Sequence, residues 1–445
     1  MKRALSLIAA AALCCLAASC GNSASRLKRQ ILSDTLMDRV DSMAQAVAAT
    51  GFSAGNVYKE VWIRDFNTFM ELSLSVMPEV QVREALDTYF DFQGEDGNIP
   101  DAFVEVSDTQ GLGYNYRFCP WRPNLAAHKN TVETDQESSL VQAVAQYVEI
   151  TGNVAYLSSV PTAAPADTLD AAQPGATVLE HLCDAMNYLR NCKWCDTYGL
   201  ITGATTADWG DVQPEHGWGV ELDANTHYTI DIYDNAMFAL ALGDLARLCH
   251  LADADSLAGR WQALRDTLAA NVRTHLWDAE RGKYKPHIYL NGSPFPEGFD
   301  EEAIYYHGGT AVAALAGLMT PDEVAAANAA MVANVAAAGA QSIGLTLYPC
   351  YPDGFFANPM MGAWQYQNGG DWTWFGARMI QALVGFGLLR EAYDELRPML
   401  ERAVADGGFY EWYHIDGTPV GSGTYRGAAG VLYKANRMLR EAASE

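Results

Sequence analysis

Apolar residues recur at helical spacing along almost the whole chain, whereas the strict alternation expected of strands is scarce. One helix start is especially clear at Thr320-Pro-Asp-Glu323, where Thr can cap the first turn, Pro is tolerated in it and Glu stands at the third position. The segments with this spacing are approximately residues 28–49, 66–77, 81–93, 137–151, 176–191, 232–250, 256–275, 309–318, 321–337, 372–387, 390–404 and 426–442. The pattern therefore predicts twelve helices arranged as six helical hairpins.

Every second predicted helix is preceded by a short motif of polar, aromatic and glycine residues. In a closed ring of hairpins, alternate helices lie inside, so the starts of the inner helices converge at one end. Helix starts offer free N–H groups and a positive dipole end, which favour polar ligands. The pattern thus predicts an all-α fold, an (α/α)6 barrel with a binding funnel, in preference to an open solenoid. The motifs are Val61-Trp-Ile-Arg-Asp-Phe66, Glu133-Thr-Asp-Gln-Glu137, Asp231-Ile-Tyr-Asp-Asn235, Tyr305-Tyr-His-Gly-Gly309, Tyr366-Gln-Asn-Gly-Gly-Asp-Trp372 and Thr424-Tyr-Arg-Gly427.

Two long segments interrupt the helical pattern. Residues 94–132 and 192–230 have few helical signals and many Gly, Pro, Trp, Tyr and Asp residues. Long loops within a compact domain are usually functional, so these two are expected to roof the end of the barrel where the motifs meet.

Composition limits the possible partners. The formal net charge of −25 disfavours nucleic acid, because an acidic protein repels a phosphate backbone. The chain also contains 11 Trp, 22 Tyr and 15 Phe, and many of them stand beside Gly, Asp or Asn in short motifs. Uncharged partners such as sugars, held in a cleft lined by rings, fit this composition better. A monomer is expected.

The N-terminus has the form of a targeting segment. Lys2 and Arg3 precede a short apolar stretch, which ends in small residues before Cys20. This pattern predicts a lipoprotein signal peptide over residues 1–19, a lipid on Cys20 and a tether over residues 20–27. Residues 28–445 would form a single catalytic domain in the bacterial cell envelope, with membrane contact only through the lipid.

The cysteines and histidines do not indicate a metal or a cofactor. Cys192-Lys-Trp-Cys195 is a single C-x-x-C without a second pair, so a few buried thiols, or one disulfide, are expected instead of a zinc or redox centre. The histidines are not spaced as metal ligands.

Asp208 is the first candidate for a catalytic acid. It precedes Trp209 and Gly210 in the second long loop, and an indole beside a carboxyl can desolvate it and keep it protonated. Asp211 is the rival for the same role. An Asp in this setting can also form an Asx-turn or cap a helix, and this alternative stays open.

Glu411 is the candidate for a catalytic base. It follows a Gly pair and has Tyr410, Trp412 and Tyr413 as neighbours, in a segment between the last two predicted helices. A Glu held among rings in this way can orient a water molecule as a general base. Glycoside hydrolysis requires such a pair of carboxyl groups, one to protonate the leaving oxygen and one to activate water or to attack directly.

Further residues of the motifs could bind a sugar, the rings by stacking and the polar groups through hydroxyls. Arg64 and Asp65 could equally form a buried pair at a helix start. The candidates for substrate binding are Trp62, Arg64, Asp65, Asp101, Gln136, Trp209, Asp211, Asn368, Trp372, Trp412 and Arg426.

Four of these segments resemble motifs of the neutral/alkaline invertases, glycoside hydrolase family 100, in the same order along the chain. Val61-Trp-Ile-Arg-Asp-Phe66 resembles its V-R-D-F segment, and residues 202–210 loosely resemble the loop of its general acid. Tyr366-Gln-Asn-Gly-Gly-Asp-Trp372 resembles its Y-H-N-G-G-x-W motif, and residues 409–417 resemble its P-E-Y-Y-D-G motif. The resemblance covers most of residues 55–440, and related six-hairpin glycosidases share similar motifs.

The resemblance implies an (α/α)6 barrel, inverting hydrolysis of a small saccharide or terminal glycosidic bond, Asp208 as the acid and Glu411 as the base. Two other functions stay open. A non-catalytic glycan-binding lipoprotein would keep the aromatic residues without two opposed carboxyl groups. A sugar epimerase on the same barrel would need histidines at its centre, where His307 is the best-placed candidate.

Overall fold

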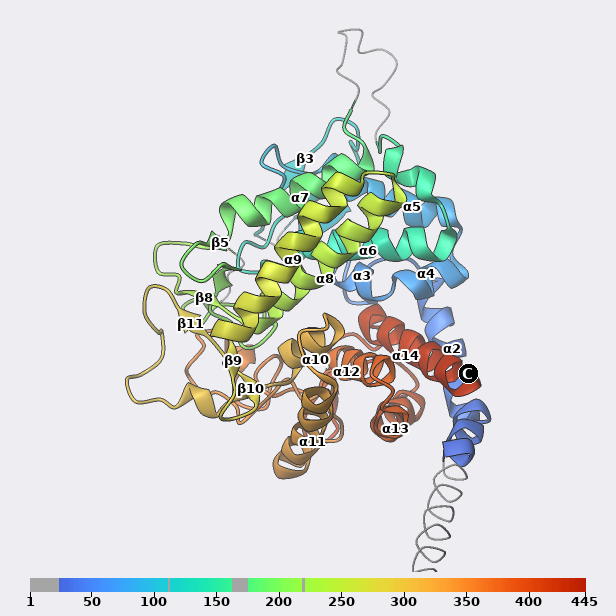
Figure 1. The fold of residues 1–445 in the computed structure, drawn as a ribbon, viewed down its shortest axis with the longest axis vertical. Helices are drawn as coiled ribbons and strands as arrows, with labels where there is room; N and C mark the ends of the chain where they lie inside the picture. The colour runs from blue at the N-terminus through green and yellow to red at the C-terminus, as the bar shows by residue number, and fades with distance from the viewer. Residues whose placement is uncertain (1–23, 111–112, 162–174, 218–220) are drawn as a thin grey trace, which may run out of the picture.

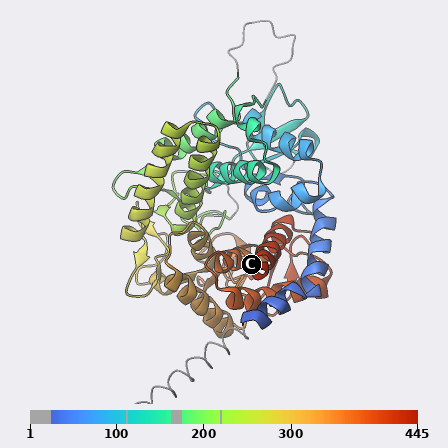
Figure 2. The same ribbon diagram turned by 45° about the vertical axis from the view of Figure 1, so that its right-hand side comes forward.

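The computed structural model describes residues 24–110, 113–161, 175–217 and 221–445, and in these ranges a double ring of helices forms the molecule (Figures 1 and 2). Neighbouring inner helices pack against each other around the ring, which closes where α14 contacts α3 and α4. The inner helices are α3 (Ile63–Thr68), α4 (Met70–Val76), α6 (Gln136–Thr151), α8 (Ile232–Leu251), α10 (His307–Leu315), α12 (Thr373–Gly385) and α14 (Arg426–Ser444). The outer helices are α2 (Thr35–Ala48), α5 (Glu79–Asp91), α7 (Val178–Cys192), α9 (Asp255–His275), α11 (Pro321–Ala338) and α13 (Leu389–Asp406). The predicted (α/α)6 barrel is confirmed.

Taken together, the inner helices are buried on more of their surface than the outer helices, in agreement with their sequences. The inner helix α12 is buried on every side from Thr373 to Val384, whereas the outer helix α9 buries only Trp261, Leu268 and Val272. A helix covered all round must be apolar or carry satisfied polar groups, and one covered on a single stripe can carry charge on the rest.

Local signals fix the helix ends. Thr320 and Glu323 form the predicted capping box of α11, which ends at Gly339 in the left-handed conformation. Except for α4, the inner helices start within a polar–aromatic–glycine motif or directly after it, so the motif residues form first turns as well as the loops before them.

Two predicted helices are interrupted. The segment 28–49 breaks before α2, because Asp34 caps that helix by accepting a 2.9 Å hydrogen bond from the Leu36 N–H. The segment 66–77 breaks at Phe69, against which the backbone of Gly430 in α14 packs so closely that a side chain at Gly430 would overlap it. Residues 24–32 are helical and Leu27 is buried, so this part of the expected tether packs onto the ring.

Short antiparallel strands occupy the two long segments that were expected to be loops. The largest sheet has the order β1-β2-β4-β3 and ties residues 102–128 to the start of α3. The strands are β1 (Val61–Trp62), β2 (Ala102–Glu105), β3 (Arg117–Phe118), β4 (Leu125–His128), β5 (Trp194–Cys195), β6 (Leu200–Ile201), β7 (Gly203–Ala204), β8 (Tyr228–Ile230), β9 (Trp277–Asp278), β10 (Lys283–Tyr284), β11 (Ile288–Tyr289), β12 (Tyr305–Tyr306), β13 (Leu347–Tyr348), β14 (Trp412–Tyr413) and β15 (Pro419–Val420).

Cys20 and the predicted signal peptide lie outside the described residues. Within the described ranges, no helix combines the length and the apolar character needed to cross a membrane. The six cysteines of these ranges, Cys192 and Cys195 among them, carry free thiols.

Candidate active site

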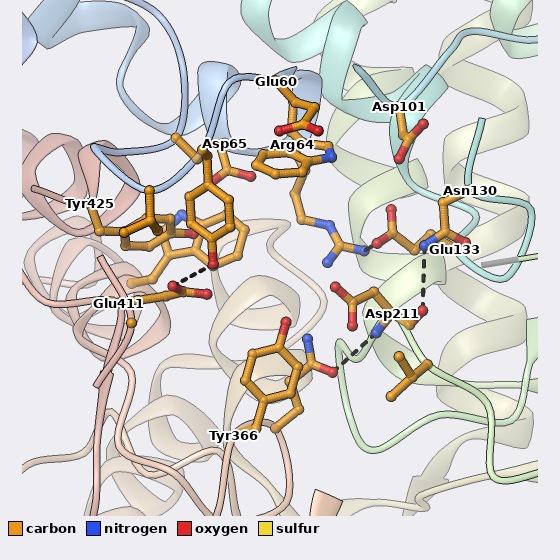
Figure 3. Close-up of a pocket in the computed structure, with 18 of the residues that line it drawn as sticks. Glu60, Arg64, Asp65, Asp101, Asn130, Glu133, Asp211, Tyr366, Glu411 and Tyr425 are labelled. Carbon is orange, nitrogen blue, oxygen red and sulfur yellow. Dashed lines mark hydrogen bonds and ion pairs between the residues drawn. The ribbon is translucent and has the colours of Figure 1, made fainter. Parts of the chain in front are cut away.

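A cavity of about 590 Å³ opens at the end of the barrel where the inner helices begin. Its walls come from the first turn of α3, the segments before α6, α12 and α14, the loop around Asp211 and the β14–β15 hairpin. Figure 3 shows Asp211 and Glu411 on opposite sides of this space, with Arg64 and Asp65 on a third side and Tyr366 facing them. Four of the six motifs therefore contribute to one pocket, whereas the motifs at residues 231–235 and 305–309 supply none of its lining residues.

Glu411 is buried and held by its neighbours on two elements. Its Oε2 accepts a 2.7 Å hydrogen bond from the Tyr58 hydroxyl and a 3.3 Å bond from the Ser422 N–H. Its own N–H donates to the Ser422 carbonyl across the β14–β15 hairpin. Burial raises the pKa of this carboxyl, while the two donors oppose the shift by favouring the ionised form.

Asp211 is held through its backbone and by a hydrogen bond from Gln367 to its carboxyl, which faces the cavity. Its N–H donates to Oε1 of Gln367, and its carbonyl accepts from the side-chain amide of Asn130, both at 3.3 Å. Oδ1 is buried without a hydrogen-bond partner among the described residues. Burial raises the pKa of Asp211, and the nearby guanidinium of Arg64 partly opposes this. A carboxyl in this state can hold a proton and donate it.

Asp208, which the sequence indicated as the acid, does not line the cavity. Its Oδ2 and Oδ1 accept hydrogen bonds of 2.6 and 2.8 Å from the N–H groups of Gly308 and Gly309, in the first turn of α10. Asp208 is thus a helix-capping residue, the alternative that its sequence context left open.

The loop around Asp208 is tightly fitted to α10. Side chains at Gly308 and Gly309 would overlap Trp209 and the Asp208 carboxyl, which explains the glycine pair in that motif. Asp208 itself has a φ of 55°, a left-handed conformation that is uncommon outside glycine. The anchor at Asp208 fixes the turn that carries Asp211 into the cavity three residues later.

Arg64 is saturated by acidic partners. Its Nε lies 2.6 Å from Oδ2 of Asp135, and its Nη2 lies 3.0 Å from Oε1 of Glu133. The hydroxyl of Tyr233 donates to the same Asp135 oxygen at 2.6 Å. Burial raises the pKa of Glu133, and Arg64 opposes that shift. Arg64 and Asp65 both line the cavity, but each pairs with another residue. Arg64 pairs with the two acidic residues just named, and Asp65 accepts a hydrogen bond from Tyr425.

The rings on the cavity wall differ in how far they are exposed. Trp209 is buried between Phe375, stacked at 4.3 Å between centroids, and Trp372, edge-on at 4.7 Å. Trp62 is half-buried and meets Tyr58 edge-on at 5.0 Å. Trp62 can therefore offer a ring face to a ligand, while Trp209 mainly shapes the wall.

Most of the residues expected to bind substrate line the cavity. Asn368 and Arg426 do not: Asn368 bonds to the backbone of Tyr351, and Arg426 bonds to Ser53. The expected residues that do line it are Trp62, Arg64, Asp65, Asp101, Gln136, Trp209, Asp211, Trp372, Glu411 and Trp412.

Several lining residues were not singled out from the sequence. Glu133, Tyr366 and Tyr425 stand inside the recurrent motifs, so the motif positions themselves were the available signal. Tyr58 and Glu60 precede the first motif, and Tyr114 and Asn130 lie in the first long segment, where no pattern marked them. All seven line the cavity.

The structure places no histidine on the cavity wall among the residues it describes. His307 is buried, where its ring nitrogens contact the Ile343 carbonyl at 3.4 Å and the Asn334 side chain at 3.0 Å. Burial lowers the pKa of His307 to about 4, which keeps the ring neutral. In the described ranges, no group of three His, Cys, Asp or Glu side chains is arranged to hold a metal ion.

Comparison with solved structures identifies the architecture. A mannosylglycerate hydrolase of glycoside hydrolase family 63 from Thermus thermophilus, in complex with glucose, matches with a TM-score of 0.61 at 15% identity, over 89% of this chain and 99% of that one. A rhamnosidase from Klebsiella oxytoca with rhamnose bound matches with a TM-score of 0.57 at 14% identity, over 91% of this chain and 64% of that one. A family 78 rhamnosidase of a Bacillus species matches with a TM-score of 0.58 at 16% identity, over 90% of this chain and 35% of that one.

No protein-family model matches the chain, and no curated protein matches it either. The structural likeness establishes a fold shared with six-hairpin glycosidases of families 63 and 78 and does not single out family 100.

Proposed function

We propose that this protein is a glycoside hydrolase that cleaves a small saccharide or a terminal glycosidic bond by an inverting mechanism, with Asp211 as the acid and Glu411 as the base. The observation that carries the proposal is the placement of these two carboxyl groups on opposite walls of one cavity (Figure 3). The fold shared with glycosidases supports the same class of reaction.

In the proposed reaction, protonated Asp211 donates its proton to the glycosidic oxygen as the bond from that oxygen to the anomeric carbon breaks. Ionised Glu411 accepts a proton from a water molecule, whose oxygen forms the new bond to the opposite face of the same carbon. The products are the free sugar with inverted configuration and the alcohol of the leaving group. The carboxyls then return to their starting states by exchanging protons with water.

The environments of the two carboxyls suit these roles. The carboxyl of Asp211 is raised in pKa and retains an unpartnered oxygen, which favours a protonated acid. Glu411 receives two hydrogen bonds that favour its ionised form. Both carboxyls line the same cavity of about 590 Å³, in which the sugar and the water would bind.

The two alternative functions are less well supported. An epimerase of the kind considered from the sequence needs histidines at the barrel centre, and the described cavity wall has none. A binding protein has no need for two opposed carboxyls, whereas hydrolysis requires one as the acid and one as the base.

The test separates the acid from the base by the leaving group. Each glycosyl fluoride in a panel of common sugars is compared with the corresponding methyl glycoside. Fluoride leaves with little need for a proton from an acid, whereas the alkoxide of a methyl glycoside must be protonated as it leaves. Asp211→Asn should lose methyl glycoside hydrolysis but keep much of its fluoride hydrolysis, and Glu411→Gln should lose both. Glu401→Gln, an exposed change on α13, serves as the control.

The stereochemical part of the proposal has its own readout. Proton NMR during the first minutes of fluoride hydrolysis should show the anomer opposite to that of the substrate. Retention of configuration would overturn the inverting assignment, and full activity of Glu411→Gln on both substrates would overturn the assignment of the base.

We also propose that the protein is held in the bacterial cell envelope by a lipid on Cys20, on the strength of the N-terminal sequence pattern. Full-length protein expressed with a radiolabelled fatty acid should carry the label. Cys20→Ser should abolish the labelling, and label retained by this variant would contradict the proposal.

A further inference from the structure

The cavity has far more acidic than basic side chains on its walls. Only Lys59 and Arg64 are basic among the described residues that line it. The acidic residues that line it are Glu60, Asp65, Asp101, Asp108, Glu133, Asp211 and Glu411. The wall as a whole is therefore rich in groups that accept hydrogen bonds from hydroxyls and poor in groups that attract an anion.

Neither basic residue is placed to bind an anion in the cavity. Arg64 is held by Asp135 at 2.6 Å and Glu133 at 3.0 Å, and its third nitrogen lies 3.4 Å from the Trp209 carbonyl. Lys59 is exposed, so water competes for its ammonium group and weakens its field. A carboxylate, phosphate or sulfate inside the cavity would thus face carboxyl groups, while the buried cation of the lining, Arg64, is already paired with Glu133 and Asp135.

The cavity already disfavours additional negative charge. The pKa of the Asp65 carboxyl is raised to about 7, mainly by burial and to a smaller extent by the charges of Glu411 and Asp211. Asp211 likewise raises the pKa of Glu411. These groups repel each other's charges, and an anionic ligand would add to the same repulsion.

We propose that this cavity takes sugars that are uncharged on both sides of the cleaved bond, and that the charge distribution of its walls excludes sugars or leaving groups bearing a carboxylate, phosphate or sulfate. The proposal rests on the proposed glycoside hydrolase function, because the neutral sugars are substrates only if the protein cleaves them. The charge selectivity itself concerns binding alone and can be measured without turnover.

The experiment compares ligands of one shape and different charge. D-glucose and D-glucuronate form one pair, and D-mannose and D-mannuronate form a second. Binding to the full chain is followed near pH 7 and at low salt by tryptophan fluorescence, because Trp62, Trp209 and Trp372 line the cavity. In each pair that binds, the neutral sugar should bind at least about tenfold more tightly than the uronate, which corresponds to about 1.4 kcal/mol.

Two variants test whether the charges of the wall cause this difference. Glu60→Gln combined with Asp101→Asn removes two carboxyls from the cavity. This variant should show a smaller difference in binding affinity between the neutral sugar and the uronate. Glu401→Gln removes an exposed carboxyl elsewhere and should leave this difference unchanged. The difference should also become smaller as salt is added.

The outcomes distinguish this inference from the proposed function. Equal affinity within the pairs, tighter binding of a uronate, or no binding by any of the four sugars would overturn the charge selectivity. A protein that prefers the neutral sugars but cleaves neither fluorides nor methyl glycosides would overturn the hydrolase proposal and leave the selectivity standing.

Discussion

The hydroxyl of Tyr58 donates a 2.7 Å hydrogen bond to Oε2 of Glu411, and this bond joins residues 353 positions apart in the chain. Tyr58 lies just before the first inner helix, and Glu411 lies just before the last one. The bond therefore spans the part of the molecule where the ring of hairpins closes, and it holds the carboxyl of the proposed base.

Tyr58→Phe is expected to move the acidic limb of the pH–rate profile to higher pH. The hydroxyl favours ionised Glu411, so its loss raises the pKa of that carboxyl further, and the base becomes protonated at a higher pH. A hydrogen bond to a charged group contributes about 1.5–3 kcal/mol, which corresponds to a shift of about one pH unit or more. The shift of the acidic limb is measured from the profile of kcat/KM against pH for the most reactive fluoride.

The phenylalanine ring can keep the edge-on contact with Trp62, so the fold should be little affected. Thermal unfolding of Tyr58→Phe controls for this. An acidic limb at the same pH as in the natural protein would show that the bond does not set the ionisation of Glu411.

Asp208→Asn is expected to reduce stability and activity together. An asparagine has one carbonyl oxygen, so it cannot accept from both Gly308 and Gly309, and its NH2 group would face one of their N–H groups. A buried donor left without a partner costs about 1–3 kcal/mol, to be measured by urea unfolding. Because the turn that carries Asp211 would shift, the activity on fluorides and on methyl glycosides should fall by similar factors. Selective survival of fluoride hydrolysis would instead mark Asp208 as the acid.

Gly421→Ala is expected to abolish activity although residue 421 is exposed. Gly421 has a φ of 77°, and a Cβ there would overlap the carboxyl of Glu411. The proposed base would have to move away from Tyr58 and Ser422. A Gly407→Ala variant, also at positive φ but with open space around the added Cβ, controls for backbone strain and should retain more activity. Equal losses in the two variants would attribute the effect to strain alone.

The sequence could predict the fold because the fold rests on local patterns that recur. Apolar spacing located the helices, and a polar–aromatic–glycine motif at each inner helix start indicated the ring and the end that carries the pocket. These signals are strong because inner and outer helices are buried to different degrees over their whole length.

The assignment of individual residues was less certain, because it depends on contacts between distant segments. Asp208 and Asp211 are three residues apart in one motif, and only the position of Gly308 and Gly309 shows that the first is turned toward α10. Tyr58 lies in a segment without periodicity, and nothing in the local sequence indicates that it meets Glu411. The side-chain partners of Asn368 and Arg426 are likewise set by tertiary packing.

The pH dependence of stability should reflect carboxyls that are buried with raised pKa values. Burial raises the pKa of Asp65 to about 7 and the pKa values of Asp231 and Asp244 to about 6, from an ordinary value of 3.8. Between pH 4 and 7 the folded protein therefore holds protons that the unfolded chain has released. By linkage, these carboxyls lower the free energy of unfolding as the pH rises through this range.

Asp65→Asn should remove part of this dependence, since the amide keeps the shape of the side chain and carries no charge. At pH 7.5 the variant is expected to be more stable than the natural protein by about 2 kcal/mol, given about 1.4 kcal/mol for each unit of pKa shift and partial relaxation around the charge. Near pH 4.5, where Asp65 is protonated when folded, the difference should be small. Urea unfolding at the two pH values measures both quantities, with Glu401→Gln as the exposed control. Equal stabilisation at both pH values, or destabilisation at pH 7.5, would show that the ionisation of Asp65 does not oppose folding. The free-energy cost of burying ionised carboxyls in this cavity would then have to come from other residues.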